Sequence, residues 1–446
     1  MESNQLVEEV VHDISEMDIT TTSSSALSPE HINSVPETRK IFSRYQSPDL
    51  SSIISLRSQT ESLIESVDWE ALREYAAAKR RGIDCSLFPN IGYVYGHKAR
   101  IIEFTDGVQW LAQLRLPSLY GRYSSGDSIK TNMECEFHTV SLLRQRTSLP
   151  IPEIHAYDTR SDCCVKAPFI LMDWVEGSDS NEISEEDIPY RYKQTLLSGL
   201  AKIHVQLSKV LLPQIGTIVS LNADGTCQQG PIPGLGGPFN TATEFFRAWA
   251  AKVKAGLPED RREIAEGRNA AEIISSVLSF PESISRLADR LSVLDSGPFP
   301  LCHGSFSHHN LIIDDAWQIL GVIGWDTAFA GPWEIFGDFP LSFSPMPRAM
   351  DFPHNYTEDG VHKNRYITQR LMDQENYVVA VEREENQNGG TPHRLADTLR
   401  DSKRQQLATA MRLYEKGTRG FYENLIHEFE LSEESQTHNL VPTQLA

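Results

Sequence analysis

The sequence predicts a mixed α+β protein, in which a small antiparallel sheet with one packed helix precedes a larger, mainly helical region. The first observation is the order of patterns in residues 61–177, which reads as helix, hairpin, helix, strand and strand. The second is the dominance of amphipathic helical patterns across residues 178–431. The third is a late hairpin within residues 299–336, whose strands are flanked by polar side chains.

Length and composition narrow the class of protein. A chain of 446 residues with 40% hydrophobic content can form one two-part domain or two ordinary ones, with a substantial core. The net charge of −20 argues against nucleic-acid binding, and no basic cluster suits an anionic membrane. The six cysteines form no CxxC pair, and there is no apolar run of membrane-helix length and no signal peptide. We therefore expect a soluble, cytoplasmic monomer with reduced thiols.

Both ends of the chain are expected to lie outside the folded part. Residues 1–60 include a run rich in serine and threonine and poor in aromatic residues, which predicts a disordered leader. Residues 432–446 predict a flexible tail.

The elements of the small sheet begin at residue 69. A helix is expected over residues 69–82, where apolar residues recur at helical spacing before a glycine. Two strands then flank Asp106-Gly107, a strong hairpin signal. A helix over residues 134–147 and two strands, of which the second spans residues 167–177, complete this part.

The helical region opens with a strongly amphipathic helix over residues 190–212. A second helix is expected over residues 243–253, and a third, over residues 281–294, directly precedes the late hairpin. Residues 364–431 predict charged helices that break at residues 388–390. These last helices would form a solvated face, and their acidity would alternatively suit a cationic small molecule.

The late hairpin brings the candidate functional residues to one end of two strands. Apolar segments at residues 311–313 and 319–323 predict the strands, and Asp314-Asp315 predicts the turn between them. Polar or conformationally special residues precede the first strand and follow the second. These candidates are His303, Ser305, Asn310, Gly324 and Asp326.

This layout resembles a phosphotransferase site of the protein-kinase type. In such sites a base aspartate is followed, five residues on, by a metal-binding asparagine, and a second aspartate after the next strand holds Mg²⁺. Ser305 and Asn310 keep the five-residue spacing. However, Ser305 occupies the base position and Gly324 occupies the position of the metal-binding aspartate.

Seven fragments in order extend the resemblance from about Trp69 to about Phe343. They include RQRTSLPIPEIHAYD, APFILMDWVEG, CHGSFSHHN and GVIGWDTAFAGPWE. In this order they resemble the aminoglycoside-phosphotransferase-like and choline-kinase-like proteins abundant in fungi. The resemblance implies a two-lobed protein-kinase-like fold, with an N-lobe over residues 61–177 and a C-lobe over residues 178–431.

The resemblance also implies ATP and Mg²⁺ as cofactors if the protein is active. The phosphate-binding cation aligns with the neutral Gln113, while Arg115 lies two residues on, facing the same side if the strand is regular. The glutamate that orients this cation aligns with Glu136, which would be free or paired with an arginine. The junction of the lobes, where a nucleotide base would bind, aligns with Met172, Asp173 and Trp174.

Three hypotheses follow. The first, which we prefer, is a pseudo-phosphotransferase that binds a small molecule or a protein. A neutral Ser305 cannot take a proton near pH 7, which removes a base contribution of about 10²- to 10⁴-fold, and Gly324 offers Mg²⁺ no ligand. The second is an atypical ATP-dependent phosphotransferase acting on a small-molecule hydroxyl, with Asn310 and Asp326 holding Mg²⁺. The third is a folded relic without a selected role.

Several of these side chains also have a structural interpretation. His303, His308 and His309 are expected to brace their loop by hydrogen bonds, with a metal site as the alternative. Asp326 either fills a structural place or replaces the missing metal ligand. Cys302 is expected to fill a small space in the core.

Overall fold

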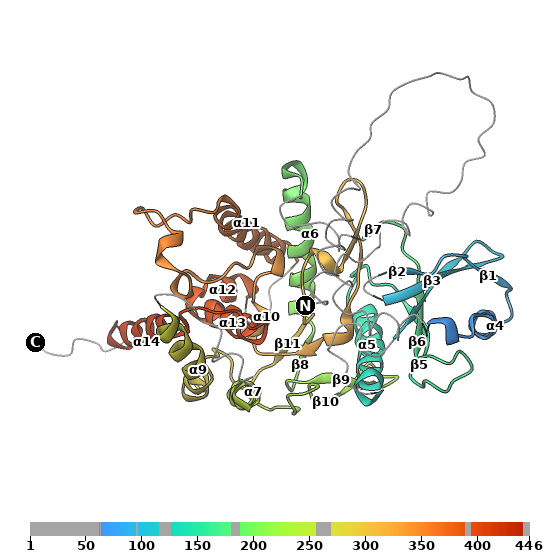
Figure 1. The fold of residues 1–446 in the computed structure, drawn as a ribbon, viewed down its shortest axis with the longest axis horizontal. Coiled ribbons are helices and arrows are strands. Elements are labelled where there is room, and N and C mark those ends of the chain that lie inside the picture. Colours follow the sequence, from blue (N-terminus) through green and yellow to red (C-terminus); the bar gives the residue numbers. More distant parts are fainter. Residues whose placement is uncertain are drawn as a thin grey trace, which may run out of the picture. The chain divides into compact units, whose positions relative to one another are not determined.

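A computed structural model describes residues 62, 64–94, 97–115, 126–179, 188–255, 269–388 and 394–439 (Figure 1). The expected leader over residues 1–60 lies outside the described residues. In the described part of the chain, none of the helices is both long and apolar enough to cross a bilayer.

A six-stranded antiparallel sheet forms the N-terminal part (Figure 1). At its centre, β3 (His97–Phe104) and β4 (Gln109–Leu114) form the expected hairpin. The turn contains Gly107 at φ +83°, a left-handed conformation that glycine adopts without strain. The remaining strands are β1 (Cys85–Leu87), β2 (Gly92–Val94), β5 (Ile154–Asp158) and β6 (Phe169–Asp173).

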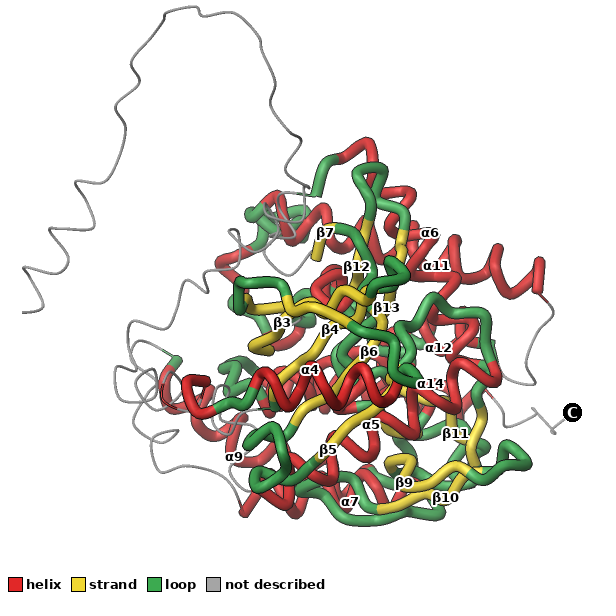
Figure 2. Tube along the Cα trace, turned by 90° about the vertical axis from the view of Figure 1, so that its right-hand side faces the viewer, coloured by secondary structure: helices red, strands yellow, loops and turns green. Residues whose placement is uncertain are grey.

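Helices cover both faces of this sheet. Helix α5 (Gly126–Arg146) shares a core with one face, and α4 (Trp69–Lys79; Figure 2) lies against the other. Leu72 and Ala76 of α4 are buried in that second core. The sequence predicts one packed helix, and the structure adds the second. Because alternate residues of the central strands enter two different cores, both faces are apolar and β4 lacks the alternation of a half-exposed strand.

The rest of the described chain is mainly helical, which confirms the predicted fold class. Helix α11 packs along α6, and α7 packs along α9. Helix α11 ends at Asn388, where the sequence predicts a break. The longer helices are α6 (Tyr190–Ser208), α7 (Ala242–Ala255), α9 (Ala270–Leu287), α11 (Arg365–Asn388), α13 (Ser402–Glu415) and α14 (Tyr422–Asn439), and the shorter ones are α10 (Trp333–Phe336) and α12 (Leu395–Arg400).

Some helix boundaries differ from the sequence prediction. Helix α9 contains Pro281 in its interior rather than at its start, because Val277, one turn earlier, and Phe280, directly before it, are also buried in the core. Helix α14 continues beyond residue 431, where the tail was expected to begin. Glu433 holds this extension in place by an ion pair with Arg404 at 2.9 Å.

The late hairpin is confirmed as β12 (Leu311–Ile313) and β13 (Ile319–Val322). Asp314 Oδ1 stabilises the turn by accepting hydrogen bonds from the N–H groups of Ala316 (2.9 Å) and Gln318 (2.8 Å). Short strands in the C-terminal part were not predicted. They are β7 (Ser178–Asp179), β8 (Leu211–Leu212), β9 (Thr217–Leu221), β10 (Cys227–Gly230), β11 (Phe299–Cys302) and β14 (Phe329–Ala330).

Candidate functional site

The loop over residues 303–310, which follows β11, is braced by a buried histidine. His303 Nε2 donates to the carbonyl oxygen of Ile323 at 2.9 Å, and its Nδ1 accepts from Ser305 N at 3.4 Å. Burial lowers the pKa of His303 to about 4, so the ring is neutral, as these two roles require. His303 therefore ties the 303–310 loop to the end of β13, in agreement with its expected bracing role.

Asn310 is turned toward its own loop. Its Nδ2 donates to the carbonyl oxygen of Ser305 at 2.5 Å. On the other side of the amide lies Gly324, at φ +80°, where a Cβ atom would come within 2.6 Å of Asn310 Oδ1. The amide of Asn310 thus occupies the space beside residue 324.

These residues do not fit a magnesium site of the kind that the resemblance implies. Mg²⁺ requires several oxygen ligands in near-octahedral geometry, usually including carboxylates. Gly324 provides no side chain, and Asp326 is the carboxylate that remains. Among the residues that the structure describes, no group of three His, Cys, Asp or Glu side chains is placed to hold a metal. His308 Nδ1 instead hydrogen-bonds Ser342 Oγ at 2.7 Å.

A buried arginine lies two residues beyond Gln113, the position that the resemblance assigns to a phosphate-binding cation. Gln113 is buried and neutral, but Arg115 points to the same side and forms an ion pair with Glu136 at 2.5 Å. Arg115 also bonds Gln113 Oε1 at 3.3 Å and the ring of His97. Of the two expectations for Glu136, pairing with an arginine is therefore the one observed.

Burial shifts the pKa values of Glu136 and His97 in this cluster. Desolvation raises the pKa of Glu136 to about 7, aided by the negative charge of Asp326 and opposed by Arg115. Desolvation and the charge of Arg115 lower the pKa of His97 to about 3, so His97 accepts a hydrogen bond from Arg115. Asp326, in the turn η4 (Trp325–Thr327) that packs against α5, connects this cluster with the 303–310 loop.

The residues at the expected nucleotide-base position are used within the fold. The N–H of Asp173 donates to Glu153 O at 2.9 Å, and the N–H of Trp174 donates to Gln109 O at 3.2 Å. Met172 is buried in the core, against which the Trp174 indole also packs. A base bound here could not use these two backbone donors, and the assignment of Met172, Asp173 and Trp174 to a nucleotide stays a prediction.

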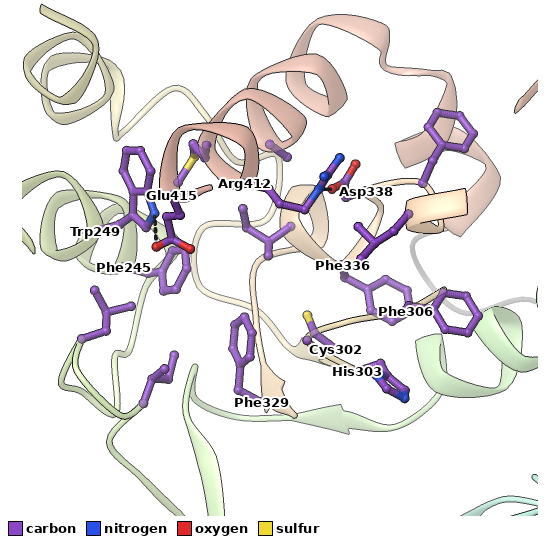
Figure 3. A pocket seen from close by; sticks show the side chains of 18 of the residues that line it. Phe245, Trp249, Cys302, His303, Phe306, Phe329, Phe336, Asp338, Arg412 and Glu415 are labelled. Carbon is purple, nitrogen blue, oxygen red and sulfur yellow. Dashed lines mark hydrogen bonds and ion pairs between the residues drawn. The ribbon is translucent and has the colours of Figure 1, made fainter. Parts of the chain in front are cut away.

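A cavity of about 240 Å³ lies beside the 303–310 loop (Figure 3). Phe245 and Trp249 lie on one side of it, and Phe306 and Phe336 on the other. Its remaining aromatic lining comes from Phe329 and Phe339. The cavity is thus apolar over most of its wall.

A second, more open cavity of about 690 Å³ adjoins the first. Both are lined by Gly304, and the second adds Ser305 and Asp326. Gly304 itself approaches η4 so closely that a Cβ atom would lie 2.3 Å from Thr327 O. We call the first cavity the apolar chamber. Together the two cavities extend from this chamber to Ser305, the position where the catalytic base is expected.

Sequence reasoning missed most of the residues that line the apolar chamber. Helix α13, expected to be part of a solvated face, contributes Met411, Arg412 and Glu415 to the wall. The sequence gives little indication of a cavity here, because Phe245 and Trp249 on α7 have the spacing of ordinary core residues on a helix.

Residues 121–334, which include α5 and the late hairpin, match the model described as the phosphotransferase enzyme family. No curated protein sequence matches the chain.

Solved structures of phosphotransferases also align along most of the chain. A macrolide 2'-phosphotransferase from Brachybacterium faecium is 16% identical, with 79% of this chain and 94% of that chain covered and a TM-score of 0.41. The aminoglycoside phosphotransferase APH(4)-Ia is 13% identical, with 81% and 97% covered and a TM-score of 0.42. The matched segment carries the 303–310 loop, the late hairpin and the Glu136 helix, so this part of the chain is similar to the phosphotransferase enzyme family.

Proposed function

We propose that this protein binds a small molecule through a phosphotransferase fold and does not carry out efficient phosphoryl transfer. The observation that carries the proposal is the arrangement of Asn310 between Ser305 and Gly324. Its amide is bonded to the Ser305 carbonyl and fills the space where a metal-binding carboxylate would project. Phosphoryl transfer depends on positioned cations that neutralise phosphate charge, so this replacement removes its central requirement.

Loss of the base supports the same conclusion. The hydroxyl of Ser305 cannot accept a proton at neutral pH, so general-base assistance of about 10²- to 10⁴-fold is missing. In contrast, the buried pair of Arg115 and Glu136 keeps a cation two residues beyond the position that the resemblance assigns to the phosphate-binding cation. The scaffold is therefore retained while the chemical centre is altered.

Calorimetry with ATP, with and without Mg²⁺, tests the proposal. We expect no Mg-dependent binding by the wild type and a gain of micromolar affinity, about −8 kcal/mol, by Ser305→Asp/Gly324→Asp. Aspartate tolerates left-handed backbone better than most residues, and a bound cation would draw Asn310 Oδ1 away from its present position. Ser86→Asp/Gly107→Asp adds the same charge away from the site and serves as the control.

ATP turnover by the wild type would overturn the proposal. The alternative would then be an atypical phosphotransferase that acts on a small-molecule hydroxyl with Asp326 and Asn310 as metal ligands. It is favoured by the position of Asp326, which lines the same cavity as Ser305. Asp326→Ala would abolish activity in that case.

A further inference from the structure

The apolar chamber has the size and lining of a site for a small ring compound. An apolar cavity of about 150 Å³ holds benzene, so the chamber of about 240 Å³ has room for a two-ring molecule. Phe245 and Phe329 have nearly parallel rings with centroids 6.3 Å apart, and His204 lies 4.5 Å from the ring of Phe336. Aromatic walls of this kind favour flat, apolar ligands.

The charges at the rim of the chamber are already paired with one another. Arg412 Nε donates to Asp338 Oδ2 at 2.5 Å, and Thr409 donates to the same carboxylate at 2.8 Å. Glu415 accepts from Trp249 Nε1 at 3.0 Å and lies 3.6 Å from Lys252 Nζ. A cationic ligand would compete with Lys252 for Glu415 and with Arg412 for Asp338, and it would lie close to those two cations.

The chamber adjoins the outer cavity beside the 303–310 loop. Gly304 borders both cavities, and Ser305 and Asp326 line only the outer one. A ligand with its rings in the chamber would therefore direct a polar substituent past Gly304 toward Ser305. This orientation places a hydroxyl group at the position of the altered base.

We propose that the chamber binds a neutral two-ring compound that presents a hydroxyl group toward Gly304 and Ser305, and not a polycationic aminosugar. This inference deepens the proposed function, because it names the class of small molecule that the fold would bind. It rests on the aromatic walls, the balanced charges and the path to Ser305.

Calorimetry with three probes tests it on the full chain. 2-Naphthol is neutral at pH 7, naphthalen-2-ylmethanamine has a similar ring system with a positive charge, and kanamycin A is a polycationic aminosugar. We expect micromolar binding of 2-naphthol, at least tenfold weaker binding of the amine, and no binding of kanamycin. If 2-naphthol does not bind, or if the amine or kanamycin A binds more tightly than 2-naphthol, the inference is wrong.

Two variants locate the binding. Ala408→Leu projects extra carbon atoms into the chamber from α13 and should weaken 2-naphthol binding more than tenfold. Ala78→Leu makes the same change at an exposed position of α4 and should leave binding unchanged. Phe329→Ala, which removes one aromatic wall, should weaken binding about tenfold. Equal binding by the wild type and Ala408→Leu would place the ligand elsewhere and contradict the inference.

Adding Mg-ATP separates this inference from the proposed function. Naphthyl phosphate detected by mass spectrometry would overturn the proposed lack of transfer and leave the ligand class intact. Absence of naphthol binding, with absent ATP turnover, would overturn the ligand class alone.

Discussion

At the scale of single residues, the most consequential contact is the buried ion pair of Arg115 with Glu136. Both side chains are less than one-tenth exposed, so each depends on the other for compensation of its charge. The arginine also reaches Gln113 and His97, which makes it the centre of the N-terminal polar cluster.

Replacing one member of this pair should lower the free energy of unfolding strongly, whereas replacing both members should lower it much less. We expect Arg115→Met to lower the free energy of unfolding by about 3–5 kcal/mol, because Glu136 would remain buried without a partner. Arg115→Met/Glu136→Leu should recover most of this loss. Urea unfolding of the three proteins measures both effects, and a double variant less stable than Arg115→Met would contradict the explanation.

The close contact at Gly324 makes a second prediction. Gly324→Ala should destabilise the protein by about 1–3 kcal/mol through its left-handed backbone, and additionally through the clash with Asn310 Oδ1. Gly107→Ala is the matched control, since Gly107 has φ +83° but open space around it. Thermal unfolding should show the larger loss for Gly324→Ala, and equal losses would mean that Asn310 moves aside freely.

Part of this site could be predicted from the sequence. The spacing of Ser305 and Asn310 identified the loop, because that spacing is local. The partner of Glu136 stayed open, because Arg115 lies 21 residues away and its direction depends on the regularity of β4. Local patterns do not determine such distant pairings.

At the scale of elements, helix α4 is attached to the sheet by a small separate core. Leu72 is completely buried there, together with Trp110 and Phe169. We expect Leu72→Ala to cost about 3 kcal/mol and to raise amide hydrogen exchange in α4 before α6. Leu431→Ala, at a position 49% exposed, should change stability by less than about 0.5 kcal/mol. A uniform rise in exchange would show that the two cores unfold together.

Helices and strands could be predicted where the pattern of apolar residues was continuous over one short stretch of sequence. The late hairpin follows from two apolar segments around Asp314, and α4 from its helical spacing. The start of α9 was not found, because Pro281 is a typical first residue of a helix. The strands β9 and β10 are short, and they form because they pair with each other in the folded chain, which a local sequence pattern does not indicate.

At the scale of the whole molecule, buried histidines should couple stability to pH. Burial lowers the pKa of His204 and of His303 to about 4, from about 6.5 when unfolded. Between these values the unfolded chain binds protons that the folded chain does not, so stability falls as the pH decreases from 6.5 toward 4. Glu136, whose pKa is raised to about 7, opposes this trend.

Urea midpoints at pH 7 and pH 5 measure the balance. We expect a lower midpoint at pH 5, since the three lowered pKa values, those of His97, His204 and His303, outweigh the one raised value, that of Glu136. Glu136→Gln should steepen the fall because it removes the opposing group. A midpoint that rises toward pH 5 would contradict the assignment of neutral, buried rings to His204 and His303.

The apolar chamber is also a feature of the whole molecule, because segments far apart in the sequence form it. Local sequence patterns therefore did not predict it. Its walls come from α7, the 303–310 loop, β14, α10 and α13. These segments meet only in the folded chain, and each of their aromatic residues is separately compatible with an ordinary core.

The packing of Asn310 against Gly324 also limits how this protein can change by mutation. An aspartate introduced at position 324 would collide with the amide of Asn310 unless the 303–310 loop rearranged as well. A metal-binding carboxylate at this position thus requires coordinated substitutions, and Gly324→Asp is destabilising when made alone. The order in which substitutions are made therefore decides which of them the site accepts.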